Sequence, residues 1–301
     1  MIAHFDDFCL WVYVLVDDMY KELEGHLRRP GPKPKCSDSE LIAISLIGEC
    51  LGWDVETEML SHMQAHRDKF PIIPDQSRFN RRRRNLMGTI NEMRRMMLAR
   101  TELYWDEHCV VDSLPVPVVK FHLAPQSRIR WSDWGADYGP VSSKKIMIFG
   151  YKLHMLITLG GLIIDFELAP ASKLDLAVGR ELLAGHKNRI VIGDKAYVSA
   201  PAAEDLWHYN RICLLTKRRK NQKKQLTKHI RRLYDSVRQM IETVTSQLEA
   251  QFSIETNRAH TLWGLCARLY TKLAAHTLCI YINRLLGAPD YLKIKKLAFH
   301  N

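Results

Sequence analysis

Three acidic residues, each in a different kind of segment, have the chemistry needed for metal-dependent phosphoryl transfer. Asp112 interrupts an apolar run at residues 109–116, and Asp194 follows a second apolar run at residues 189–193. Glu242 lies within a long helix-like segment. Carboxylates on separate elements can converge on one point and hold two divalent ions about 3.5–4 Å apart, which activate a nucleophile and stabilise a leaving oxygen. The pattern therefore predicts that these three residues are both catalytic and metal-binding.

Each of these carboxylates also has an ordinary structural explanation. A single Asp at the end of a strand is usually a turn or cap residue. Glu249 lies two turns after Glu242 on the same helical face and competes with it for the third position. Arg238 precedes Glu242 by four residues, so it either forms a simple helix salt bridge, holds Glu242 in place, or contacts a DNA phosphate.

The charge of the chain favours an anionic partner. The 301 residues carry a formal net charge of +11, which suits a nucleic acid or an anionic membrane surface. No apolar run reaches the roughly 18 residues needed to span a bilayer. The N-terminus lacks a basic segment, so no signal peptide is visible. The seven cysteines are scattered without a Cys-x-x-Cys pair, which argues against a zinc knuckle and favours a reducing cytoplasm.

Two clusters of basic side chains are candidates for phosphate contacts. The residues in these clusters are Arg78, Arg81, Arg82, Arg83, Arg84, Lys217, Arg218, Arg219, Lys220, Lys223 and Lys224. A run of like charges is most often a solvated surface. Beside a site for phosphodiester chemistry, however, phosphate contacts become the better explanation, and they would make binding depend on salt without reading sequence.

The first hundred residues predict helices. Residues 5–23 are rich in apolar side chains, and three prolines at 28–35 must end that helix. Ser37 and Glu40 then match a capping box at the start of the next helix. After a second break, one helix is expected over residues 76–103, with an apolar face and an arginine-rich face.

The pattern changes to alternating strands and helices after residue 105. Two prolines predict that the extended segment 109–119 is an edge strand or a strand with a break. Further strands are expected at 146–159 and 162–168, joined as a hairpin by a Gly-Gly pair, and at 189–193 and 211–215. Helices are expected at 173–184, 200–209, 226–252 and 262–286. This order predicts an α/β fold with a mixed sheet flanked by helices.

Together with the three acidic residues, several short segments resemble a known family. These segments are residues 79–84, 111–116, 150–154, 169–175, 193–197, 238–243 and 252–255. The chain resembles the DDE transposases of bacterial insertion sequences, and most closely the insertion sequence 982 family within the insertion sequence 4 and 5 type. In that family the first Asp lies on the first strand, the second follows the fourth strand, and the Glu lies on a late helix.

The resemblance implies a fold, a reaction and partners. It implies a ribonuclease H-like catalytic domain at residues 105–290, an all-helical N-terminal region at 1–104 that binds DNA ends, and a tail at 291–301. The reaction would be cleavage at the element ends and joining of the 3′-hydroxyl to target DNA, with two Mg²⁺ ions for which Mn²⁺ can substitute. The partners would be double-stranded DNA, as terminal inverted repeats and target, and a second copy of the chain in a homodimer on DNA, in the bacterial cytoplasm beside the nucleoid.

The Glu helix departs from the Tyr, Arg, Glu, Lys signature that related transposases carry. Arg238 and Glu242 keep their spacing, which is why we favour Glu242 over Glu249. Tyr234 lies one residue too far upstream, and Glu249 occupies the place of the Lys. Another base must therefore make the phosphate contact of that Lys, and the nearby candidates are Lys228, Arg231 and Arg232.

Other residues in the catalytic region are expected to be structural. The aromatic segment 131–138 is expected to pack as a hydrophobic flap, with stacking on a splayed DNA base as the alternative. His154 is expected to lie in the core or near DNA, because Mg²⁺ prefers oxygen ligands. Asp175 matches a family position and is expected to be a cap or turn residue. Two other functions remain open: a nuclease of the same fold without strand transfer, and a catalytically silent DNA-binding regulator.

Overall fold

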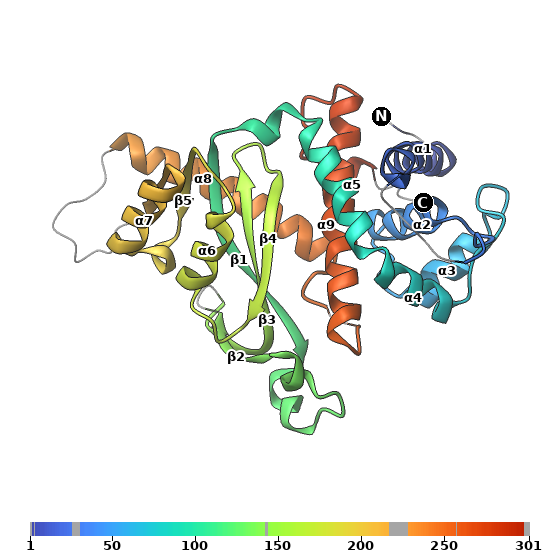
Figure 1. Ribbon diagram of the computed structural model, residues 1–301, viewed down its shortest axis with the longest axis horizontal. Helices are drawn as coiled ribbons and strands as arrows, with labels where there is room; N and C mark the ends of the chain where they lie inside the picture. Colours follow the sequence, from blue (N-terminus) through green and yellow to red (C-terminus); the bar gives the residue numbers. More distant parts are fainter. Residues whose placement is uncertain are drawn as a thin grey trace. The chain divides into compact units, whose positions relative to one another are not determined.

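The chain folds into two compact units. The computed structural model describes residues 2, 4–25, 31–141, 144–216, 228–256 and 258–297 (Figure 1). We call residues 1–100, 247–254 and 258–301 the helical unit, and residues 101–246 and 255–257 the sheet unit. No helix in the described ranges is long and apolar enough to cross a membrane.

The helical unit is built around two strongly buried helices. Its helices are α1 (Phe5–Glu24), α2 (Asp38–Cys50), α3 (Glu56–Gln64), α4 (Gln76–Asn85), α5 (Met87–Ala99), α9 (Leu262–Leu285) and the short η5 (Ile294–Leu297). The predicted capping box starts α2: Ser37 Oγ accepts the Glu40 N–H at 3.0 Å, and the Glu40 carboxylate accepts the Ser37 N–H at 2.5 Å. Both ends of this reciprocal pair satisfy amides that would otherwise lack a helical partner.

Helix α9 groups with the N-terminal helices. The sequence placed residues 262–286 in the catalytic domain, but the structure assigns α9 to the helical unit, where it packs against α2 and α5. Side chains on nearly every face of α9 are buried, which is typical of a central helix surrounded by others. The helical unit is therefore formed by both ends of the chain.

The arginine-rich helix is divided in two. One helix was expected over residues 76–103, but α4 ends and α5 begins at Leu86, whose φ of −91° and ψ of 2° lie outside the helical region. The Leu86 side chain is buried. The prediction of one helix was wrong. A continuous apolar face in the sequence does not show whether the two halves of the segment, α4 and α5, can pack against the same neighbours.

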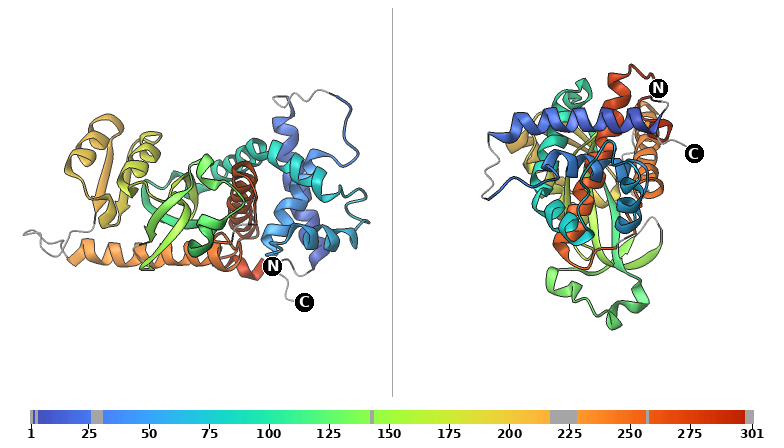
Figure 2. Two further views of the ribbon diagram at one scale, coloured as in Figure 1. Left: turned by 90° about the horizontal axis from the view of Figure 1, so that it is seen from below. Right: turned by 90° about the vertical axis from the view of Figure 1, so that its right-hand side faces the viewer.

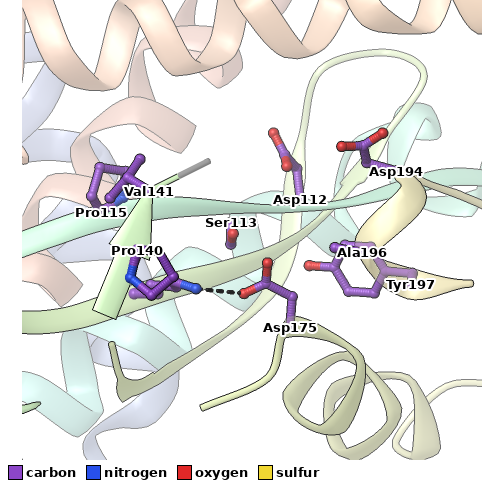
Figure 3. Close-up of a pocket in the computed structure, with 10 residues that line it drawn as sticks. Asp112, Ser113, Pro115, Pro140, Val141, Asp175, Asp194, Ala196 and Tyr197 are labelled. Carbon is purple, nitrogen blue, oxygen red and sulfur yellow. Dashed lines mark hydrogen bonds and ion pairs between the residues drawn. The ribbon is translucent and has the colours of Figure 1, made fainter. Parts of the chain in front are cut away.

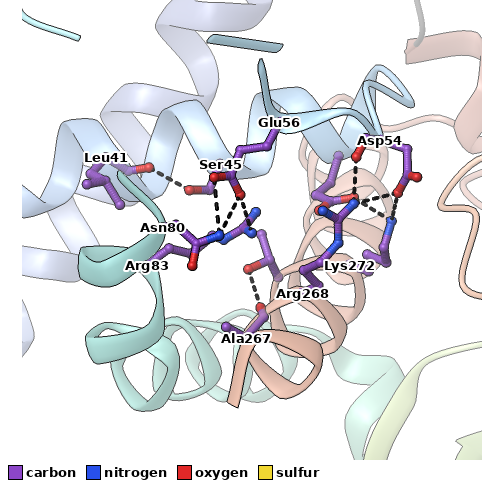
Figure 4. Close-up of polar contacts among 12 residues, drawn as sticks. Leu41, Ser45, Asp54, Glu56, Asn80, Arg83, Ala267, Arg268 and Lys272 are labelled. Carbon is purple, nitrogen blue, oxygen red and sulfur yellow. Dashed lines mark hydrogen bonds and ion pairs between the residues drawn. The ribbon is translucent and has the colours of Figure 1, made fainter. Parts of the chain in front are cut away.

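Buried ion pairs link the segments of the helical unit (Figure 4). Lys272 on α9 donates to Glu49 on α2 at 2.9 Å and to Asp54 at 3.0 Å. Arg268, one turn before Lys272, also donates to Asp54, at 2.7 Å. All four charged side chains are largely buried. Such a network depends on every partner, because removing one leaves a buried charge without compensation.

The sheet unit contains six strands among its described residues. They are β1 (His108–Val119), β2 (Asp137–Val141), β3 (Ile146–Thr158), β4 (Ile163–Pro170), β5 (Arg189–Gly193) and β6 (Ile212–Thr216). The order is β2-β3-β1-β5-β6, and β4 pairs with β3. Strands β1 to β4 pair antiparallel, whereas β1, β5 and β6 run parallel. The mixed sheet expected from the order of elements is confirmed.

Strand β1 lies inside the sheet, so of the two predicted alternatives the edge strand was wrong and the strand with a break is confirmed. It pairs with β3 along most of its length and with β5 over His108 to Val111. Pro115 and Pro117 lie beyond that parallel stretch, where β1 has β3 as its neighbour. In this stretch β5 no longer pairs with β1, so one side of the strand has no ladder hydrogen bond that needs a backbone N–H. Proline, which has no N–H, can therefore be accommodated there. A register shift between Pro117 and Val119 supplies the expected break.

Three helices cover the two faces of this sheet. They are α6 (Asp175–Ala184), α7 (Ala200–Asn210) and α8 (Lys228–Ala250). Figure 2 shows α8 along one face, with α6 and α7 on the other. Tyr234 and Val237 of α8 form a cluster with Val110 of β1 and Ile192 of β5. The predicted hairpin is present in β3 and β4, and Gly161 in its turn has a φ of 82° that favours glycine.

Candidate active site

Asp112 and Asp194 lie side by side on neighbouring parallel strands. Val111 of β1 is in register with Gly193 of β5. Asp112 directly follows Val111, and Asp194 directly follows Gly193. Figure 3 shows the two carboxylates on the same side of the sheet. Both residues line a pocket of about 100 Å³. Two carboxylates that are 82 positions apart in the sequence are thus brought together by one strand pairing.

The pocket also contains groups that the sequence did not assign to the site. Its other lining residues are Ser113, Pro115, Pro140, Val141, Lys152, Asp175, Ala196 and Tyr197. Asp175 is the first residue of α6, and its carboxylate accepts a hydrogen bond from Lys152 Nζ at 3.0 Å (dashed in Figure 3). Lys152 lies in residues 150–154 and Asp175 in residues 169–175, two of the segments that resemble the transposase family. This resemblance was the sequence signal that could have identified them as site residues.

Two glycines make room for Tyr197 beneath the carboxylates. Its ring is so close that a Cβ on Gly179 would lie 2.5 Å from Tyr197 Cε1, and one on Gly193 would lie 3.0 Å from Tyr197 Cβ. Tyr197 is almost fully buried, and its hydroxyl lies 3.4 Å from His154 Nδ1. Glycine at 179 and 193 therefore lets the ring form the floor of the pocket.

The electrostatics of the pocket favour binding of a cation. Burial, together with the neighbouring charges of Asp194 and Asp175, raises the pKa of Asp112 to about 6, against a backbone hydrogen bond that lowers it. Burial and the same carboxylates also raise the pKa of Tyr197 well above its ordinary value. A divalent cation between these carboxylates would offset their repulsion.

Glu242 lies on α8 and forms an exposed ion pair there. Its side chain is 63% exposed, and its Oε1 accepts a hydrogen bond from Arg238 Nε at 2.7 Å. Glu242 is not among the residues that line the pocket. Among the described residues, no three His, Cys, Asp or Glu side chains are grouped to hold a metal ion. The structure thus brings together two of the three predicted acidic residues.

The rival residue and the signature tyrosine of the same helix are also placed. Glu249 is half-buried and belongs to the end of α8 that is part of the helical unit. Tyr234 packs in the cluster with Val110 and Ile192, and burial, with the nearby charge of Asp194, raises its pKa to about 12. Through Tyr234, this part of α8 packs on β1 and β5 close to Asp194.

The arginines of α4 fall into two groups. Arg78 and Arg81 are exposed and Arg84 is half-exposed, so all three are accessible to phosphate. Arg83 is buried and donates to Glu56 at 2.6 Å, and Arg82 donates to Asp38 at 2.6 Å. We therefore correct the prediction of DNA contacts for these two arginines, because their charges are already paired inside the helical unit.

The second basic cluster, with Lys217, Arg218, Arg219, Lys220, Lys223 and Lys224, lies outside the described residues. The side chains of Lys228 and Arg231, two of the alternative phosphate contacts, also lie outside the described part of the structure. Arg232, the third alternative, is exposed on α8. Its position leaves it available to an anionic ligand.

The aromatic segment before the hairpin contains packed side chains. Trp131 is 1% exposed, and its ring lies 5.6 Å from the ring of Trp134 in an edge-on arrangement. The Trp134 carbonyl accepts a hydrogen bond from the Tyr151 hydroxyl at 2.8 Å. This packing supports the interpretation of a hydrophobic flap. The segment also leads into β2, a strand that the sequence analysis did not predict.

Comparison with known proteins identifies the family. Residues 106–262 match the model of the transposase DDE domain, and this region covers more than half of the chain. The chain therefore belongs to the transposase DDE domain family. No curated protein and no solved structure matches the chain. Asp112, Asp194 and Glu242 all lie inside the matched region.

The residues of the pocket fit the divalent metal ions that DDE transposases generally use. Carboxylate oxygens are the ligands that hard divalent cations prefer. Asp112 and Asp194 present such oxygens from adjacent strands, and burial, with the neighbouring charges of Asp194 and Asp175, raises the pKa of Asp112. These two residues are the ones that the structure offers as ligands, with Asp175 held nearby by Lys152.

Proposed function

We propose that the protein is a transposase that cleaves DNA at the ends of an insertion sequence and joins the freed 3′-hydroxyl to target DNA. One observation carries the proposal: Asp112 and Asp194 share a pocket at neighbouring strand positions, within the region that matches the DDE domain. A transposase acts on DNA, and the net charge of +11 suits that substrate.

We propose that the catalytic domain is ribonuclease H-like and that the element belongs to the insertion sequence 982 family. Support for the fold comes from the sheet, in which β4, β3 and β1 are antiparallel and β5 and β6 continue from β1 in parallel. The resemblance of the short segments supports the finer family. A homodimer on DNA follows from the need to process two ends together.

We propose that Asp112, Asp194 and Glu242 hold two Mg²⁺ ions, for which Mn²⁺ can substitute. When bound, the ions would lower the pKa of a water molecule and neutralise charge on the reacting phosphate. The contribution of the protein is to position these carboxylates and the DNA, since positioning and charge neutralisation supply most of the rate in phosphoryl transfer.

We propose that DNA is held by basic residues outside the pocket. Arg78, Arg81 and Arg84 of the helical unit are accessible to phosphate, as is Arg238 of α8, whose side chain is 70% exposed. The cluster at residues 217–224 would add phosphate contacts. Sequence must be read by base-edge contacts, and a helix of the helical unit placed in the major groove would supply them.

The test is cleavage and strand transfer on labelled DNA that carries the element's own ends, with Mg²⁺, Mn²⁺ or EDTA. Metal-dependent nicking at the end together with joined products would support the transposase. Metal-dependent cutting without joined products would favour a nuclease of the same fold. Tight end binding without chemistry in either metal would indicate a DNA-binding regulator and would overturn the proposed reaction.

A further inference from the structure

The carboxylate pocket contains a lysine that the proposed reaction does not yet use. Lys152 is the only cation among the described residues that line the pocket. It lies on β3 in register with Pro115 of β1, and the residue is 8% exposed. An ammonium group is strongly hydrated, so its position in a confined pocket must be balanced by nearby negative charge.

Asp175 supplies part of that balance. Lys152 Nζ lies 3.0 Å from Asp175 Oδ1, and the Asp175 side chain is 22% exposed. A simple structural explanation is that this pair fastens β3 to the start of α6. Ion pairs in confined positions contribute little net stability, however, because the loss of hydration offsets most of their attraction. Stability alone therefore gives a weak reason for a lysine at this position.

The ammonium group retains the capacity to bind a second partner. It has three N–H donors, and Asp175 is the partner that the described residues provide. Two donors therefore remain for a ligand that enters the pocket. The pocket that Lys152 lines is also lined by three carboxylates, those of Asp112, Asp194 and Asp175.

A DNA phosphate is the ligand whose chemistry fits these donors. A phosphate that approaches the three carboxylates would be repelled unless positive charge lies beside it. Bound metal ions would provide part of that charge, and a lysine ammonium is a compact charge well suited to a phosphate oxygen. The attraction is stronger in a confined pocket than on an exposed surface, because less water screens it.

We infer that Lys152 binds a non-bridging oxygen of the DNA phosphate that is cleaved, and that Asp175 positions the ammonium group for this contact. The inference rests on the proposed function. Lys152 would thus be a substrate-binding residue, and Asp175 a positioning residue.

The test pairs a change in the protein with a change in the DNA. End DNA would carry either an ordinary phosphate or an uncharged methylphosphonate at the cleaved position. Binding would be measured by fluorescence anisotropy in Ca²⁺ for the wild-type protein, Lys152→Met and Lys187→Met. Lys187 is an exposed lysine just before β5, at the opposite end of this strand from Asp194, and its replacement removes the same charge.

Lys152→Met and the methylphosphonate should each weaken binding by about 10-fold, the usual scale for a hydrogen bond between charged groups. Combined, they should weaken it little further, because both remove the same contact. Lys187→Met should leave the full effect of the methylphosphonate. Independent, multiplying losses for Lys152→Met, or a wild-type protein indifferent to the methylphosphonate, would overturn the inference.

A second variant separates positioning from folding. Asp175→Asn keeps Lys152 but should reduce the loss of affinity that the methylphosphonate causes. If the Lys152–Asp175 pair only stabilised the fold, Asp175→Asn would lower the melting temperature and leave that loss of affinity unchanged. Lys152→Arg should restore part of the lost affinity, because it restores the charge. Nicking of unmodified end DNA by the wild-type protein in Mg²⁺ tests the proposed function separately. Failure of that reaction would refute the transposase even if Lys152 binds the phosphate.

Discussion

Arg238 and Glu242 form an ion pair one helical turn apart on α8, with 2.7 Å between Arg238 Nε and Glu242 Oε1. Their side chains are 70% and 63% exposed, so water screens the attraction and the pair stabilises the helix by no more than about 0.5 kcal/mol. A contact this weak is easily exchanged for another partner. The Glu242 carboxylate can therefore exchange this contact for one with a metal ion.

Replacement of Glu242 by Gln should abolish end cleavage and leave end binding nearly unchanged. The amide keeps the shape of the side chain but removes the charge that a metal ligand needs. Glu249→Gln is the matched control on the same helix and should retain cleavage. Rates of nicking and equilibrium binding on the same labelled end DNA would measure both effects. Full cleavage by Glu242→Gln would remove Glu242 from the site.

Asp112→Asn should stabilise the metal-free protein at pH 7.5 and abolish stabilisation by Mg²⁺. The folded-state pKa of Asp112, about 6, is above its ordinary value of 3.8, so folding binds the proton more tightly. Stability from this group is present at low pH and is lost as pH rises from about 4 to about 6. Removing the charge should therefore gain up to about 3 kcal/mol above pH 6.

Thermal unfolding of the wild-type protein and Asp112→Asn, with and without Mg²⁺, would measure these two effects. The wild-type melting temperature should rise with Mg²⁺ because the ion binds the folded state selectively. An equal rise in Asp112→Asn would contradict the assignment of this carboxylate as a ligand. A variant less stable than the wild type at pH 7.5 would contradict the sign of the pKa effect.

Arg83→Met should destabilise the helical unit, whereas Arg81→Met should affect DNA binding instead. Loss of Arg83 leaves Glu56 buried without its cation, which costs about 3–5 kcal/mol. Arg81 is exposed, and its replacement should change stability by less than about 0.5 kcal/mol. Urea unfolding would give the stabilities. The salt dependence of DNA affinity should fall for Arg81→Met, and an unchanged dependence would mark Arg81 as a solvated surface residue.

The helical unit should lose stability below about pH 6.5 because of His276. Complete burial lowers the pKa of His276 from 6.5 to about 4, and its Nε2 lies 2.9 Å from Gln247 Oε1. The unfolded chain therefore binds a proton that the folded chain excludes, and stability falls as pH decreases from 6.5 towards 4. The loss should reach about 3 kcal/mol. His276→Gln should show a shallower decline in melting temperature between pH 7 and pH 5, and an identical slope would contradict this account.

Local sequence signals were sufficient for most individual elements. Ser37 and Glu40 started α2 as a capping box, and the Gly-Gly turn produced the hairpin of β3 and β4, because these structures depend on residues close together in the chain. The break at Leu86 was not predicted, and the sequence left open whether β1 is an edge strand or a strand with a break. Both depend on which neighbours are available for packing or pairing, and local periodicity carries no such information.

The sequence indicated the chemistry of the site, but the fold decided which residues come together in it. Residue types and spacing singled out Asp112 and Asp194, whereas the register of β1 with β5 placed them together. The same tertiary packing buried Arg83 against Glu56 and brought Asp175 to Lys152, although neighbouring arginines look alike in the sequence. Residue identity determines which groups can carry charge or bind metal. Burial and proximity depend on segments far apart in the chain, so only the tertiary structure decides which of those groups meet and which are already paired.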